Sequence, residues 1–148
     1  MNCRGLGQQG KRRDVLHYIR NYKFNIVFLQ DTHMTEQTLP FFNSLWRGTA
    51  YHSCFSARSR GTCILIDRNT SHSLIKNINS TCGNYVIVIC RIQTHVFAFI
   101  CLYGPNTDSP LFFTELFEHL ENIEVDHIVL AGDMNFVIDP ERDCLNYR

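Results

Sequence analysis

The hydrophobic positions of this chain fall into runs of two kinds, one with helical spacing and one with the length of strands. Apolar residues recur at helical spacing within residues 11–22, where Val15, Ile19 and Tyr22 share one face. A second, shorter helix is predicted over residues 40–46, because the proline that opens it suits the first helical turn. Both helices are expected to bury one face against a neighbouring layer.

Short apolar runs of strand length, most of them rich in β-branched or aromatic residues, cover residues 25–30, 61–67, 84–92, 95–103 and 128–131. The third and fourth runs are separated only by Gln93 and Thr94, which permits a hairpin and excludes a helical crossover. The last run reads IVLA and has no polar position, so it is expected to be buried on both faces.

The clearest helix covers residues 109–122, with Ser109 as its cap and Pro110 at its first position. Its buried stripe is predicted to consist of Phe112, Leu116 and Leu120, with Phe113 and Phe117. Helices combined with an antiparallel hairpin indicate an α+β fold, in which two sheets pack face to face and helices lie outside. A length of 148 residues predicts one domain, covering 1–148.

Residues 5–10 read GLGQQG, and a predicted helix, a strand and Asp31 follow them. That order is the layout of a dinucleotide-binding fingerprint. However, the strand that should deliver the glycines is absent before Gly5, and the hairpin breaks the parallel winding that this fold requires. NAD or FAD binding is therefore kept only as a minor alternative.

The net charge of zero hides an uneven distribution along the chain. Residues 1–76 hold 11 Lys/Arg and 4 Asp/Glu, whereas residues 77–148 hold 3 and 10. A basic half suits an anionic polymer and an acidic half suits a metal, although chance clustering on solvated faces explains the split equally well. The cations predicted to contact nucleic-acid phosphates are Arg4, Lys11, Arg12, Arg13, Arg58 and Arg60.

The cysteines are odd in number, seven, and include no Cys-x-x-Cys pair. Cys63, Cys90 and Cys101 lie inside apolar runs, where free thiols are expected to be buried like small hydrophobic residues. The chain opens without a signal peptide, so we expect an intracellular protein of the nucleus or cytoplasm that is not secreted. No structural zinc is expected, since histidines and cysteines do not cluster, and no membrane partner, since the apolar runs are too short.

Several predicted strands end in polar side chains. Asp31 follows the first strand, and Tyr103 ends the second strand of the hairpin with Asn106 shortly after it. Asp133 and Asn135 follow the last strand. Asn106 and Asn135 also suit turns, and Asp31 suits a helix cap, but together the five residues would place carboxylates, amides and a phenol at one rim. Oxygen ligands of this kind suit Mg²⁺ or Mn²⁺.

Four segments, MNCRGLG, FLQDTH, LYGPNTDSP and LAGDMNFVIDPERD, resemble in order and spacing the motifs of the endonuclease/exonuclease/phosphatase superfamily. They are most similar to the endonuclease that precedes the reverse transcriptase in LINE-type (non-LTR) retrotransposons. The resemblance runs from Asn2 to about Asp143. It implies a four-layer αββα sandwich that cleaves DNA phosphodiesters with Mg²⁺, in a parent protein that also contains a reverse transcriptase domain.

The resemblance also implies roles for individual residues. Asn2 and Asp31 match positions that hold the metal, Tyr103 matches a tyrosine that faces the scissile phosphate, and Asn106 belongs to the phosphate-binding loop. Asp133 matches the aspartate that orients the attacking water. Asn135, in the same motif, matches the asparagine that stabilises the developing charge.

The chain departs from the family pattern at position 31 and at both ends. Where the family usually has glutamate, Asp31 is shorter by one methylene, which retracts its carboxylate by about 1.5 Å. The family's first strand would precede Asn2, and its closing Asp-His motif would lie beyond Arg148. We therefore expect an incomplete domain, a truncated and catalytically impaired copy, with unpaired apolar edges along 85–90 and 97–103. The alternatives are a non-catalytic remnant that binds nucleic acid or a partner, and a phosphatase of the same superfamily.

Overall fold

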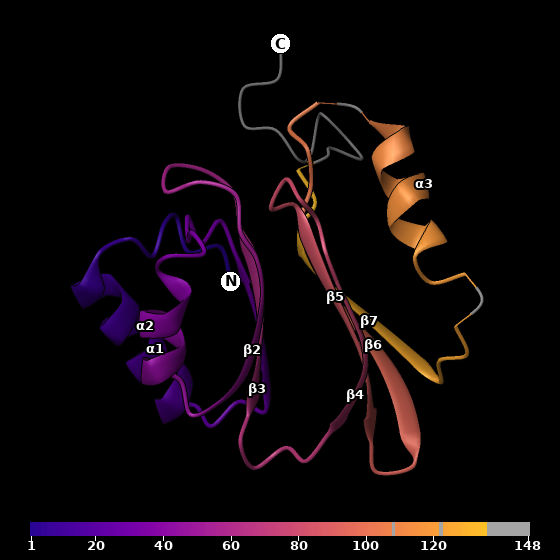
Figure 1. Cartoon of the computed structure of the whole chain (residues 1–148), viewed down its shortest axis with the longest axis horizontal. Coiled ribbons are helices and arrows are strands. Elements are labelled where there is room, and N and C mark those ends of the chain that lie inside the picture. Colours follow the sequence, from indigo (N-terminus) through magenta and orange to yellow (C-terminus); the bar gives the residue numbers. More distant parts are fainter. Residues whose placement is uncertain (108, 122, 136–148) are drawn as a thin grey trace, which may run out of the picture.

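Two β-sheets pack face to face, and helices cover the outer side of each sheet (Figure 1). The computed structural model describes residues 1–107, 109–121 and 123–135. The strands are β1 (Ile26–Gln30), β2 (Gly48–Ser53), β3 (Thr62–Asp67), β4 (Ser73–Asn79), β5 (Tyr85–Ile92), β6 (His95–Tyr103) and β7 (His127–Asp133). The helices are α1 (Gln9–Asn21), α2 (Leu39–Leu45) and α3 (Pro110–Glu118).

The first sheet has the order β1-β3-β2 and is antiparallel throughout. The second has the order β4-β5-β6-β7, in which only the β6–β7 pair is parallel. Helices α1 and α2 cover the first sheet, and α3 covers the second (Figure 1). The expected α+β fold with four αββα layers is therefore confirmed.

Helical spacing explains how α1 joins the core. Leu16 and Ile19 are 0% and 2% exposed and pack with Phe42 of α2 against the first sheet. Tyr22 was expected on the same face, but it is 61% exposed because it caps α1 beyond the last helical residue. The expected helix over 40–46 is confirmed within one residue at either end.

The period of two along β5 divides its side chains between two cores. Val86, Val88 and Cys90 point toward the first sheet, whereas Ile87 and Ile89 point toward α3. All five are 0% exposed, so β5 is buried on both faces. This accounts for the continuous apolar run in the sequence, and the predicted hairpin with β6 is confirmed.

Helix α3 closes the second sheet through Leu116, which is 0% exposed. Pro110 occupies the first turn as expected, and Ser109 stands at the N-cap without a side-chain capping bond. Phe112 and Phe113 pack against the same core. The predicted stripe is wrong at Phe117, whose side chain is 46% exposed.

Two strands were not predicted, because their sequences alternate poorly and contain many polar residues. Strands β2 and β4 read GTAYHS and SLIKNIN, and both lie at sheet edges with much of their surface exposed. The pairing of β4 with β5 overturns the expectation of an open edge along 85–90, and the pairing of β7 with β6 overturns it along 97–103. Strand β5 lies between β4 and β6, and β6 lies between β5 and β7.

The expectation that 128–131 is buried on both faces is wrong. Ile128, Val129 and Leu130 are 55%, 36% and 37% exposed. Strand β7 is the edge strand of the second sheet in the described part of the chain, and pairs only with β6 there. Its apolar sequence therefore indicates a strand, but not how deeply it is buried.

The GLGQQG segment packs against the turn after β1. The amides of Gly5 and Leu6 donate hydrogen bonds of 2.7 Å to the carbonyls of Asp31 and Thr32. Gly5 has φ +83°, and a Cβ there would lie 2.8 Å from a ring nitrogen of His33. These amides are occupied and β1 pairs antiparallel with β3, so the dinucleotide-binding alternative is wrong.

Cys63, Cys90 and Cys101 are 0% exposed, which confirms that they are buried free thiols. Burial raises the pKa of Cys101 to about 11, so its thiol stays protonated at neutral pH. None of the helices in the described ranges is both long enough and apolar enough to cross a membrane.

Candidate functional site

Asp133 is the last residue of β7, at one end of the second sheet. Its partner in the parallel register is Tyr103, which ends β6, so both side chains leave neighbouring strands at the same rim. The side-chain amide of Asn2 donates a hydrogen bond of 3.1 Å to Asp133 Oδ2, although the two residues are 131 positions apart in the sequence. Because Asn2 also forms a bridge to Gln30 at the end of β1, this bond ties the rims of the two sheets together.

The segments after β6 and β7 hold each other in place. The amide of Gly104 donates to the Asp133 carbonyl at 2.7 Å, and the side chain of Asn135 donates to the Gly104 carbonyl at 2.8 Å. The backbone N–H of Asn135 also donates to Asp133 Oδ1 at 3.3 Å. A Cβ at position 104 would overlap the carbonyl oxygen of Met134, so only glycine permits this close approach.

Asp31 and His33 follow β1 with φ of 55° and 52°, a conformation that is uncommon outside glycine. The turn brings His33 Nε2 within 2.8 Å of Asp31 Oδ1, and the two side chains are only 21% and 16% exposed. The backbone amide of Arg60 donates to the same oxygen at 3.2 Å. One oxygen of this carboxylate is therefore held by two neighbours.

A cavity of about 470 Å³ lies beside this turn, and it is lined by Asp31, His33, Phe55, Arg58, Ser59, Arg60, Tyr103 and Asn106. The Arg60 guanidinium lies 4.9 Å from the Phe55 ring centroid and donates to Asn84 Oδ1 at 3.4 Å. Asn84 in turn donates to the Tyr103 carbonyl at 2.8 Å. Two guanidinium groups and one carboxylate line this space, which suits an anionic phosphodiester.

The sequence profile of the endonuclease/exonuclease/phosphatase family matches residues 1–142. The chain belongs to this family. The transposon TX1 uncharacterized 149 kDa protein of Xenopus laevis is 22% identical over 142 residues, which cover 94% of this chain and 11% of that protein.

Solved structures show the same family fold. The endonuclease domain of TRAS1, a telomere-specific non-LTR retrotransposon, matches with a TM-score of 0.62 at 13% identity, over 91% of this chain and 58% of that one. AP endonuclease LMAP from Leishmania major matches with a TM-score of 0.66 at 14% identity, over 89% of this chain and 53% of that one. The chain thus spans a little more than half of these structures.

Members of the endonuclease/exonuclease/phosphatase family generally depend on a divalent metal. Asp31 can serve such an ion, because its Oδ2 has no hydrogen-bond partner in the described ranges while Oδ1 is held. Among the described residues, no group of three His, Cys, Asp or Glu side chains is placed to hold a metal ion. Mg²⁺ needs only one or two carboxylates and otherwise binds water and phosphate oxygens, so this donor set fits it.

Asp31→Glu tests whether position 31 is a shortened ligand of the family's metal. The longer side chain reaches about 1.5 Å further, so we expect Mn²⁺ to bind about tenfold more tightly, as measured by electron paramagnetic resonance of free Mn²⁺. Asp67→Glu makes the same change at the other end of the first sheet and should leave Mn²⁺ affinity unaltered. Weaker binding in Asp31→Glu would show that Asp31 already has the right length.

The structure places four of the six predicted phosphate-binding cations near the rim. Arg58 and Arg60 line the cavity. Lys11 donates to the Arg4 carbonyl at 2.8 Å, and the Arg4 amide donates to Asn2 Oδ1 at 3.1 Å. These contacts put Arg4 and Lys11 beside Asn2.

The other two cations, Arg12 and Arg13, lie on α1. Arg13 is exposed. Arg12 is only 8% exposed, and its guanidinium lies 4.9 Å from the Phe41 ring centroid. Little of the Arg12 side chain is left for a phosphate.

Sequence reasoning missed four residues that shape the cavity, namely His33, Phe55, Ser59 and Asn84. His33 stands two positions after Asp31, and this close spacing could have indicated that the two side chains meet. Phe55 and Asn84 come from loops outside the family motifs. Only the packing of the two sheets brings Asn84 next to Arg60.

Proposed function

We propose that the chain is a metal-dependent phosphodiester hydrolase that cleaves DNA, as the endonuclease part of a retrotransposon-derived protein. The observation that supports this most is the position of Asp133. It is fixed by Asn2 and in register with Tyr103, which lines the neighbouring cavity with Arg58 and Arg60. A carboxylate of fixed position next to a basic cavity is what hydrolysis of an anionic ester requires.

The cavity residues would bind and orient the substrate. Arg58 and Arg60 would contact the non-bridging phosphate oxygens, and the Tyr103 phenol and Asn106 amide would donate to the same phosphate. The Arg60 side chain is already held by Phe55 and Asn84, so little conformational freedom is lost on binding.

Asp133 would accept the proton of the attacking water, and Asn2 would hold this carboxylate in one orientation. Asn135 uses one amide hydrogen on Gly104, which leaves the other to donate to the phosphate as charge develops. A divalent ion held at Asp31, with Asn2 beside it, would supply additional stabilisation of negative charge on the phosphate when bound.

A second candidate function is nucleic-acid binding without cleavage. The basic cavity supports it, because Arg58 and Arg60 can hold a phosphate whether or not Asp133 acts. In either case we propose that a reverse transcriptase domain accompanies this domain in the parent protein. The similarity to the TX1 transposon protein and to the TRAS1 endonuclease domain supports that proposal.

The test is nicking of supercoiled plasmid DNA by the purified chain. We expect slow nicking with Mg²⁺ or Mn²⁺, in keeping with an impaired copy, none with EDTA, and little with Zn²⁺, since the candidate ligands are oxygens. DNA binding that is retained without any nicking would favour the second candidate function. Nicking that persists in EDTA would contradict the metal-dependent mechanism.

A further inference from the structure

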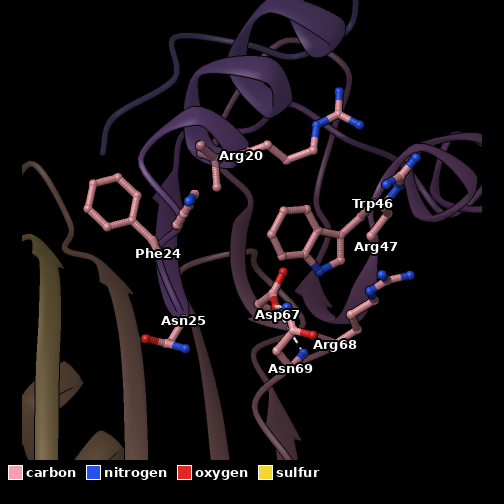
Figure 2. A pocket seen from close by; sticks show the side chains of 10 residues that line it. Arg20, Phe24, Asn25, Trp46, Arg47, Asp67, Arg68 and Asn69 are labelled. Carbon is pink, nitrogen blue, oxygen red and sulfur yellow. Dashed lines mark hydrogen bonds between the residues drawn. The ribbon is translucent and has the colours of Figure 1, made fainter.

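A second cavity, of about 340 Å³, opens at the end of the first sheet opposite to Asp31 (Figure 2). It lies where α1 leads into β1 and where the end of β3 meets the start of β2. The strand from Asn25 to Asp31 covers about 20 Å at 3.3 Å per residue. This cavity is therefore separate from the rim that holds Asp133.

Cations outnumber acids in this second cavity, whose charged lining residues are Arg20, Lys23, Arg47, Arg68 and Asp67. The carboxylate of Asp67 is already engaged, because its Oδ1 accepts the backbone and side-chain N–H groups of Asn69 at 2.9 and 2.7 Å. The ion pairs in the described ranges are His33–Asp31 and His95–Asp126. None of the cavity's four cations therefore has a carboxylate partner there. The cavity thus has an uncompensated positive charge.

Arg20 and Lys23 lie at the C-terminal end of α1, where a cation is favourable for the helix dipole alone. Arg20 Nε also donates to the Leu16 carbonyl at 3.2 Å. Neither explanation applies to Arg47 and Arg68. Both side chains are exposed, and within the described part of the chain they make no hydrogen bond.

Three exposed aromatic residues continue the surface from this cavity. Tyr18, Tyr22 and Phe24 are 49%, 61% and 44% exposed. The Tyr18 and Tyr22 ring centroids lie 4.7 Å apart, and Tyr22 stacks on Phe24 at 5.6 Å with an interplanar angle of 9°. We call these three rings the aromatic ladder. Phe24 also lines the cavity, and Figure 2 shows it across the Trp46 indole from Arg47.

We propose that the second cavity and the aromatic ladder together bind single-stranded nucleic acid. The cations would contact phosphates along the strand, and unpaired bases would stack on the exposed rings. A duplex keeps its bases stacked inside, so it could use the cations but gain nothing from the ladder. This binding does not depend on whether the chain cleaves DNA.

The test measures fluorescence anisotropy of a labelled oligothymidylate of about 16 nucleotides with the full chain, titrated between about 50 and 200 mM salt. In Arg47→Glu/Arg68→Glu we expect affinity at low salt to fall at least about tenfold. The negative slope of log affinity against log salt should also become shallower by about 1.4, because two phosphate contacts are lost. The circular dichroism spectrum should be unchanged, because both positions are exposed.

Lys76→Glu/Arg91→Glu is the matched control, since it makes the same change of charge at exposed positions of β4 and β5 outside the cavity. It should keep most of the affinity and the salt slope. An equal loss in both double variants would overturn the proposal, because binding would then depend on net charge. So would binding that is lost only in Arg58→Glu/Arg60→Glu, because the first cavity would then account for it.

The aromatic ladder has its own test in Tyr22→Ser and Phe24→Ser. Each should weaken oligothymidylate binding at least about fivefold while leaving the weaker binding of a duplex of equal length unchanged. An oligouridylate assayed in parallel shows whether DNA or RNA is the tighter ligand. Equal losses for the single strand and the duplex, or no loss for either single strand, would overturn the proposal.

Discussion

Asp133→Asn is expected to slow phosphodiester cleavage by about 10²–10⁴-fold, since the side chain loses its capacity to accept a proton. The carboxamide has nearly the same shape as the carboxylate and can still accept the hydrogen bond from Asn2. The fold and DNA affinity should therefore be unchanged. Single-turnover nicking rates with saturating Mg²⁺ measure the effect, and DNA binding is measured separately in EDTA.

Asp14→Asn is the matched control. Asp14 is exposed on α1, so this substitution removes the same charge far from the rim. Its nicking rate should equal that of the unaltered chain. If Asp133→Asn also cleaved at the full rate, Asp133 would have no role in the chemistry, and its hydrogen bond to Asn2 would be structural only.

Acidification is expected to destabilise the fold through His52. Its Nε2 lies 2.9 Å from Asn43 Oδ1, which can only accept, so the ring donates there. Its Nδ1 is buried without a partner, so a second proton would have no acceptor. Burial accordingly lowers the pKa of His52 from 6.5 to about 4.

The sign of the effect follows from which state binds the proton. Between pH 6.5 and about 4 the unfolded chain protonates this histidine and the folded chain does not. Stability is therefore complete above pH 6.5 and is lost progressively as the pH falls to about 4. The loss amounts to roughly 3 kcal/mol in the free energy of unfolding, measured by urea denaturation at several pH values.

His52→Gln removes the titrating group and keeps a donor for Asn43, so its stability should depend less steeply on pH by about that amount. His17→Gln changes an exposed histidine of α1 and should retain the full pH dependence. Parallel pH profiles for the unaltered chain and His52→Gln would contradict the assignment of this effect to His52.

The sequence predicted the structure best where a strand is buried on both faces. The run of β5 is apolar throughout because both of its faces are covered, and the hairpin to β6 follows from a connection of two residues. It was least informative at sheet edges. Strands β2 and β4 have one solvated face and an irregular pattern, so their pairing depends on neighbours that local sequence does not specify.

The candidate site shows the same division. Polar residues at strand ends predicted that Tyr103 and Asp133 would gather at one rim, and the parallel register places them together. The contact between Asn84 and Arg60 depends on how the two sheets pack, and no local pattern encodes it. Exposure of β7 was likewise unpredictable, because an apolar strand reads the same at an edge as in the centre of a sheet.

The hydrogen bond between Asn2 and Asp133 also has a consequence for biosynthesis. It joins residues 131 positions apart, so the rim cannot close until nearly all of this segment has left the ribosome. At about 5–20 residues per second, the delay between the two residues is on the order of 10 s. During that interval α1 and the first sheet can already pack, whereas the proposed cleavage site does not yet exist. A nascent chain would thus assemble the proposed cleavage site only after α1 and the first sheet are ordered.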